Sequence, residues 1–271
     1  MKIQQIRNAT IIIEYAGVRI LVDPWLAPKE SNPPLLSLIQ KYFPLENKDI
    51  KLPVGIGKNF PFCELPLEIK DIIKVDAVLA THLHFDHFDE VAAKSIPHDM
   101  PMFSQDEVDA EQLRGFGFSN VIILPDEGSY DFKGVLIHKT PCNHGVEEIY
   151  RCFPFRREAS GFVLTSPKES KKIYVVGDSV LYQGVKDTIE HFHPDVIVVN
   201  ACAATTPLGR LIMDAEEVKE TRNLAPYATI IVSHMDAVPH AMITSDEMRK
   251  FIQEQDLKNV LVPANGEIIT L

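Results

Sequence analysis

The most informative segment of the sequence is Thr81-His82-Leu83-His84-Phe85-Asp86-His87-Phe88. It directly follows the apolar run Asp76-Ala77-Val78-Leu79-Ala80, whose length and composition indicate a buried strand. If the chain stays extended past that strand, the first two histidines and the aspartate share one side and His87 points elsewhere. Two histidines can then chelate one cation, and the Asp86-His87 pair can serve a second. A polar loop with histidines by chance is the alternative, and this spacing after a strand favours the metal site.

Length, composition and charge bound the class of protein. The chain has 271 residues, enough for one large domain or two small ones with a sizeable core. Hydrophobic residues make up 45% and charged residues 24%, and no apolar run approaches the roughly 18 residues of a membrane span. The net charge of -11 argues against a nucleic-acid partner, because phosphate backbones are bound by Lys/Arg-rich surfaces. We therefore expect a small-molecule substrate and no membrane partner, and leave open a homo-oligomer.

The N-terminus and the cysteines bear on location. Residues 1–7 lead directly into strand-like sequence without the apolar core of a signal peptide. The cysteines are scattered and form no C-x-x-C pair: Cys63, Cys142, Cys152 and Cys202. Reduced thiols in the cytoplasm are therefore expected. Cys142, close to the candidate ligand His144, either lies near the metals or serves as a small buried hydrophobe.

Strands dominate the early chain and alternate with helices later. Residues 11–22 predict two strands about an Ala16-Gly17 turn, and Asp23 at their end either supports a ligand or forms a turn. Asp214 with Glu216 and Glu217, and Ser245 with Glu247, resemble helix starts. Strands followed by strand-helix alternation favour an α/β sandwich. No linker or low-complexity stretch divides residues 1–271, which indicates a single domain.

Residues 26–70 break this rhythm. The segment contains seven prolines and several aromatic residues, with one short helix predicted at about 35–42. A connection of this length in a compact domain is usually functional or flexible. We expect either a cap over the active site that contributes to substrate selection or a surface excursion that fills space.

Three further strand ends deliver a histidine or a carboxylate. The run 135–137 leads to His144, the run 173–176 ends at Asp178, and the run 230–233 ends at His234. Because sheets present strand ends at a common rim, these residues are expected to join the cluster. His240 either faces the same cavity, as a substrate or proton-transfer group, or is structural. The remaining histidines are predicted to lie elsewhere: His98, His138, His191 and His193.

The ordered set resembles a known superfamily. His82-x-His84-x-Asp86-His87, followed by His144, Asp178 and His234, resembles the metallo-β-lactamase-fold metal-dependent hydrolases. Arg7-Asn8-Ala9-Thr10 with Asp23-Pro24 resembles the branch that includes L-ascorbate-6-phosphate lactonase and many uncharacterised bacterial hydrolases. The resemblance implies a four-layer αββα sandwich with the metals at one edge of the two sheets.

The resemblance also implies roles for the ligands. One metal would be held by His82, His84 and His144, the other by Asp86, His87 and His234, with Asp178 bridging. A carboxylate at position 178 departs from the lactamases proper, where a thiolate is common. The segment after Trp25 is not part of the shared core, so the substrate cannot be carried over.

A dinuclear hydrolase is the predicted function. Two bridged cations about 3.5–4 Å apart would hold a water whose pKa falls toward roughly 7, giving a bridging hydroxide. Nitrogen and oxygen ligands favour Zn²⁺, with Mn²⁺ or Fe²⁺ as alternatives. Asp86 could orient the hydroxide, and His240 or Asp236 could protonate the leaving group.

The substrate prediction depends on three arginines. Arg151, Arg156 and Arg157 follow His144 and would suit a carboxylate- or phosphate-bearing substrate, or else are exposed loop charges. The prediction is a small anionic lactone, ester or amide. The alternatives are a metal-dependent phosphodiesterase and a non-hydrolytic metal-binding or redox module with iron and a flavin partner.

Overall fold

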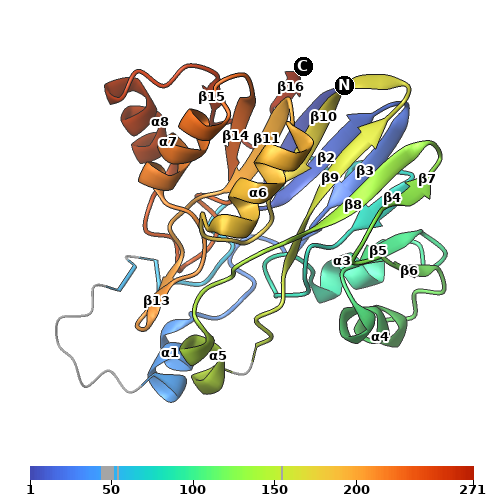
Figure 1. The fold of residues 1–271 in the computed structure, drawn as a ribbon. Coiled ribbons are helices and arrows are strands. Elements are labelled where there is room, and N and C mark those ends of the chain that lie inside the picture. Colours follow the sequence, from blue (N-terminus) through green and yellow to red (C-terminus); the bar gives the residue numbers. More distant parts are fainter. Residues whose placement is uncertain (44–51, 54, 154) are drawn as a thin grey trace.

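Two seven-stranded sheets form the centre of the molecule in the computed structural model, which describes residues 1–43, 52–53, 55–153 and 155–271 (Figure 1). In spatial order the first sheet contains β16 (Ile268–Thr270), β1 (Lys2–Arg7), β2 (Thr10–Tyr15), β3 (Val18–Val22), β4 (Ala77–Leu79), β5 (Met102–Ser104) and β6 (Val121–Ile123). The second contains β15 (Val260–Leu261), β14 (Thr229–Ser233), β11 (Val196–Asn200), β10 (Glu169–Val175), β9 (Ser160–Ser166), β8 (Val135–Pro141) and β7 (Tyr130–Phe132). A short ribbon pairs β12 (Thr205–Thr206) with β13 (Gly209–Arg210).

Each sheet is antiparallel on one side and parallel on the other. β1, β2 and β3 are antiparallel neighbours, as are β7 to β10, and the predicted Ala16-Gly17 turn joins β2 to β3. β3 to β6 and β10, β11, β14 and β15 pair in parallel. Parallel neighbours need crossover connections, which the chain supplies with helices.

The helices lie on the outer faces of the sheets and at one edge. α2 (Ile69–Ile72), α3 (Glu90–Ser95) and α4 (Glu107–Gly115) flank the first sheet, while α6 (Gln183–Phe192), α7 (Ala215–Leu224) and α8 (Ser245–Glu254) flank the second (Figure 1). α1 (Leu36–Tyr42) and α5 (Glu147–Cys152) lie together below the sandwich (Figure 1). Capping boxes start α7 at Asp214 and α8 at Thr244, so Thr244 and not Ser245 is the capping residue of α8.

The apolar residues divide into layers that follow from strand alternation. Ile11 and Ile13 of β2 point between the sheets, and Ile12 points to the α3 side. On β10, Val175 faces the first sheet while Tyr174 packs toward α6, α7 and α8. Because both faces of these strands are buried, their sequences are continuously apolar. The predicted four-layer αββα sandwich is confirmed, in one domain.

The described parts of segment 26–70 are tied to the sandwich. Arg7 is fully buried, and its guanidinium donates to the carbonyl oxygens of Trp25, Ala27 and Cys63, which are the two ends of the segment. The predicted helix is α1, which packs on α5 through Ile39 and Ile149. Residues 44–51 and 54 of the segment lie outside the described residues, so its role as a cap stays a prediction. None of the helices in the described chain has the length and apolarity that a bilayer crossing requires.

Candidate metal centre

The histidine motif after β4 turns instead of staying extended. The backbone N–H groups of His87 and Phe88 both donate to the carbonyl oxygen of His84, at 2.9 Å each. The predicted sharing of one side by His82 and His84 is confirmed, whereas Asp86 lies beyond the turn and joins the other group with His87. The turn directs His82 and His84 toward one group of ligand atoms and Asp86 and His87 toward another.

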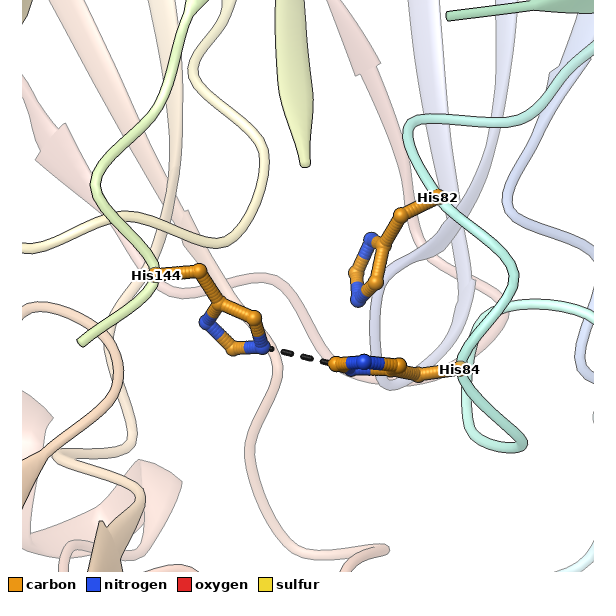
Figure 2. A group of neighbouring side chains, drawn as sticks. All are labelled: His82, His84 and His144. Carbon is orange, nitrogen blue, oxygen red and sulfur yellow. Dashed lines mark hydrogen bonds between the residues drawn. The ribbon is translucent and has the colours of Figure 1, made fainter. Parts of the chain in front are cut away.

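The first group joins His82, His84 and His144, whose ligand atoms lie within 4.8 Å of one another (Figure 2). The Nδ1 atom of His82 lies 3.0 Å from Thr81 Oγ1, and its buried Nε2 has no hydrogen-bond partner. His144 Nδ1 donates to the Leu211 carbonyl oxygen at 3.1 Å, and His84 Nε2 donates to the Arg156 carbonyl oxygen at 2.7 Å. One nitrogen of each ring is thus occupied, and the other nitrogen faces the group.

The second group joins Asp86, His87 and His234. His87 Nδ1 lies 2.8 Å from Asp23 Oδ2, and its Nε2 lies 3.2 Å from His234 Nε2. His234 Nδ1 contacts the buried Cys202 Sγ at 3.6 Å. Asp86 Oδ2 is buried without a hydrogen-bond partner, although His234 Nε2 lies 3.3 Å away.

Asp178 lies between the two groups and forms a third, overlapping group with His82 and His87, whose ligand atoms also lie within 4.8 Å of one another. Its Oδ2 is 3.2 Å from His87 Nε2 and 3.7 Å from the Nε2 atoms of both His144 and His234. Its other oxygen, Oδ1, accepts from Asn200 Nδ2 at 2.8 Å. One carboxylate oxygen is therefore held by an amide while the other faces both sets of ligands.

Asp23 supports the centre through hydrogen bonds to Thr81 and His87. The Thr81 N–H and the Thr81 hydroxyl both donate to its carboxylate at 2.7 Å, and His87 Nδ1 makes the third contact. Asp23 therefore has the first of the two roles considered for it, since it supports the candidate ligand His87 and the loop that carries it. Its φ of 45° shows that it also turns the chain after β3.

Burial and charge set the protonation of the ligands. Burial lowers the pKa of His82 and His84 and lowers that of His144 to about 4, so these rings are neutral at pH 7 and offer a lone pair. Burial works in the same direction on His87, but the carboxylates of Asp178 and Asp23 outweigh it and raise its pKa to about 10.

The donor set fits divalent cations. In the first group, His84 Nδ1 and His144 Nε2 approach to 3.3 Å, the contact drawn in Figure 2. Two neutral lone pairs at this distance repel each other, whereas a cation between them attracts both. His82 Nε2 in the first group and Asp86 Oδ2 in the second are buried without a hydrogen-bond partner, which is costly unless a cation binds them.

A small cavity opens onto the centre. Its polar side is formed by His84, Asp86, His144, Asp178, Thr205, Thr206 and His240. Its apolar side is formed by Leu35, Ile39, Phe85, Ile149, Tyr150, Phe153, Phe155 and Leu211. The volume is about 60 Å³, room for a few waters at roughly 10–15 Å³ each. The cavity therefore combines polar groups of the candidate centre with apolar and aromatic side chains.

The comparisons with known proteins agree with the fold. A family model described as the β-lactamase superfamily domain matches residues 2–232. The chain belongs to this superfamily. It is 38% identical over 273 residues to the UPF0173 protein YddR of Bacillus subtilis, with 100% of each chain covered.

Two solved structures resemble this superfamily member over its whole length. An isothiocyanate hydrolase from Delia radicum gut bacteria is 34% identical, with a TM-score of 0.87, and 100% of this chain and 99% of that one are covered. A possible metal-dependent hydrolase from Veillonella parvula is 32% identical, with a TM-score of 0.88 and the same coverage. The chain is a metal-dependent hydrolase of the β-lactamase superfamily with a candidate His/Asp metal cluster. Its place in the L-ascorbate-6-phosphate lactonase branch stays a prediction.

The structure does not bring the three candidate substrate-binding arginines to the cavity. Arg151 pairs with Glu147 on the exposed face of α5, and Arg157 donates to Asn143. Arg156 is paired with Asp106 and Asp109 at the start of α4. None of the three side chains lines the cavity described above, because each is paired with another side chain outside it.

Of the other candidate residues, His240 lines the cavity, whereas Asp236, Cys142 and the four excluded histidines do not. His240 lines the cavity, with Nε2 3.9 Å from Asp86 Oδ2 and with Nδ1 buried and unpartnered. Asp236 is exposed and accepts from Ser245 N at the start of α8, so it does not face the cavity. Cys142 belongs to neither ligand group and donates to the Val176 carbonyl oxygen. The four excluded histidines also lie outside both groups.

Two supporting residues had no assigned role in the sequence. Asn200 ends β11, and the signal that marked Asp178, a polar residue at a strand end, could have found it. Asn8 donates from Nδ2 to the Asp86 carbonyl oxygen at 3.2 Å. It lies in the Arg7–Thr10 stretch that carried the resemblance, but nothing local shows what it contacts.

Proposed function

We propose that the enzyme holds two divalent cations, most favourably Zn²⁺, and hydrolyses a small electrophile that carries an apolar substituent. The observation that carries the proposal is the convergence of ligand atoms in two groups beside one cavity. His82 Nε2, His84 Nδ1 and His144 Nε2 would hold the first cation. The second would be held by Asp86, His87 and His234, and the position of Asp178 Oδ2 suits a shared ligand.

The cations, when bound, supply Lewis acidity and a water acidified toward neutral pH. The protein supplies orientation and exclusion of bulk water. Asp86 lines the cavity with a carboxylate oxygen that lacks a hydrogen-bond partner, and it can hold a hydrogen of the attacking water. Burial lowers the pKa of His240 to about 4, so its imidazole is neutral at pH 7 and can donate one N–H to a substrate heteroatom.

The cavity favours an uncharged electrophile over an anionic one. Its lining contains no lysine or arginine among the described residues, so a phosphodiester or carboxylate would depend on the cations alone for countercharge. Phe85, Phe153 and Phe155 instead offer aromatic surface. These features support an organic isothiocyanate, R–N=C=S, the substrate class named for a structural relative that is 34% identical. Uncharged lactones and esters come next.

The proposed reaction consumes one water. The water oxygen bonds to the central carbon of the N=C=S group, the carbon–nitrogen bond breaks, and the nitrogen takes two hydrogens. The products are the amine R–NH₂ and carbonyl sulfide, so atoms balance without an oxidant or reductant. The redox alternative would instead need iron and a flavin partner.

Metal content and a substrate panel test the proposal. Protein purified without chelators or a His-tag should carry close to two Zn²⁺ or Mn²⁺ by plasma mass spectrometry and should release amine from a small organic isothiocyanate such as allyl isothiocyanate. Asp178→Ala should lose at least one metal and nearly all turnover. His138→Ala is the matched control, because His138 lies on β8 outside both groups. Two iron per chain, no metal after reconstitution, or full activity of Asp178→Ala would overturn the proposal.

A further inference from the structure

The ring of His84 is fixed by a main-chain carbonyl. Its Nε2 lies 2.7 Å from the carbonyl oxygen of Arg156, while Nδ1 faces His144 Nε2 at 3.3 Å. A carbonyl can only accept, so Nε2 must carry the proton and Nδ1 the lone pair. The position of this one carbonyl therefore determines which nitrogen of His84 is available to a cation.

The Arg156 side chain anchors that carbonyl to α4. Its guanidinium donates to Asp109 Oδ1 at 2.6 Å, and to Asp106 at 2.8 and 3.1 Å in a forked arrangement. Asp109 is buried, and its second oxygen accepts from Gln105 Nε2 at 2.7 Å. Gln105 Nε2 also donates to the Glu158 carbonyl oxygen at 2.9 Å, so the loop is held at Arg156 and again two residues later.

The same loop forms part of the cavity wall. The Phe155 ring lies 5.5 Å from the His84 ring and 5.9 Å from the Phe85 ring, measured between centroids. Phe155 also lines the cavity. A loop that moved would therefore displace both the partner of His84 and one aromatic wall.

We propose that Arg156 is a positioning residue for the metal centre: its ion pairs with Asp106 and Asp109 hold the carbonyl that keeps His84 in the Nδ1-ligating tautomer. This inference rests on the proposed metal site and replaces the expected role of Arg156 as a substrate anchor. The forked contact requires a guanidinium, because a lysine ammonium cannot engage both oxygens of one carboxylate in the same plane. The α4 N-terminus is thereby coupled to a ligand more than twenty residues away in sequence.

Three variants and a control separate positioning from folding. Arg156→Gln removes the ion pairs, Arg156→Lys keeps only the charge, and Asp106→Asn removes a charge while keeping a residue that caps α4 well. Arg114→Gln is the matched control, because Arg114 is also ion-paired on α4, to Glu107, but lies on the exposed surface. Thermal unfolding of each variant measures its fold stability separately.

Cation affinity is the first measurement. Competition with a chromophoric chelator should show one of the two Zn²⁺ ions bound about 10–100-fold more weakly in Arg156→Gln, as for other residues that orient a ligand. Asp106→Asn should weaken Zn²⁺ binding less than Arg156→Gln does. Arg156→Lys should have an affinity between those of Arg156→Gln and the wild type, and Arg114→Gln should match the wild type. The absorption spectrum of the Co²⁺-loaded protein should change with the same order. Wild-type affinity in Arg156→Gln, or a lowered unfolding temperature with unchanged affinity, would overturn the inference.

A second measurement does not need a cation. In the metal-free protein, ¹⁵N chemical shifts should show His84 as a single Nε2–H tautomer in the wild type and as a mixture in Arg156→Gln. If the wild type binds no metal, the proposed function fails, but these shifts still decide the role of Arg156. An unchanged tautomer in the variant refutes it.

Discussion

Replacing Asp23 by asparagine changes one atom of a fully enclosed carboxylate that supports the metal centre. In the wild type, Oδ1 accepts the Thr81 N–H at 2.7 Å, and Oδ2 faces Thr81 Oγ1 at 2.7 Å and His87 Nδ1 at 2.8 Å. Asparagine offers one acceptor oxygen and one donor amide. Whichever way the amide is oriented, one of the two N–H groups of Thr81 and His87 meets another donor.

The size of the effect follows from which group loses its partner. If the amide faces Thr81 N, a buried N–H is left unsatisfied, which costs about 1–3 kcal/mol of folding free energy. If it faces His87, Nδ1 must accept a hydrogen bond, so Nε2, the atom that points at Asp178, keeps its proton even when the ring is neutral. A cation can then bind Nε2 only after the proton has moved to Nδ1, which this amide does not favour. We therefore expect the zinc affinity to be about 10–100-fold weaker, or about 1.4–2.7 kcal/mol.

Isothermal titration with Zn²⁺ and urea unfolding of the metal-free protein measure the two effects. Asp76→Asn is the control, because Asp76 likewise accepts a backbone N–H, from Arg19, and pairs with Lys133 away from the centre. The control should leave zinc affinity unchanged. If Asp23→Asn bound both cations as tightly as the wild type, Asp23 would not orient His87 as argued here.

Three further outcomes follow from the structure. The pKa of His87 is raised to about 10, and that of its co-ligand His234 is raised well above the usual value, so the metal-free site is protonated at pH 7. Cation binding must release at least one proton, so affinity should rise at least about tenfold per pH unit below these pKa values; titration heats that do not depend on the buffer would contradict this. Gly177→Ala should lower the free energy of unfolding by at least about 1–3 kcal/mol. The reason is that Gly177 has a φ of 74° and that an alanine Cβ there would lie 2.7 Å from the Ser160 carbonyl oxygen; wild-type stability in urea would refute this. Ile231 is buried between the sheets, so Ile231→Ala should lower the free energy of unfolding by about 2–5 kcal/mol. Ile268 is exposed, so Ile268→Ala should change it by no more than about 0.5 kcal/mol, and equal urea midpoints for the two variants would contradict the layer assignment.

Local signals in the sequence predicted many of the elements. The run 230–233 predicted β14, and the acidic residues at 214–217 predicted the start of α7, because strand and capping patterns act between near neighbours. β5 (Met102–Ser104) was not predicted, since its three residues include no Val or Ile, unlike those of the equally short β4 and β6. The motif from His82 to His87 marked the candidate centre because its ligand-type side chains are adjacent in the chain.

Pairing and partner choice were decided by the tertiary structure. No local pattern states that β10 lies beside β11 and β9, or that the carbonyl of Arg156 reaches His84 across 72 residues. The chain around Arg156 suggested a substrate anchor because a guanidinium binds any nearby anion, and only packing brought Asp106 and Asp109 within reach. Sequence therefore determined which side chains can ligate and where strands end. The fold alone determined which atom of each side chain is occupied by a neighbour and which is left free to bind, because those neighbours come from distant parts of the chain.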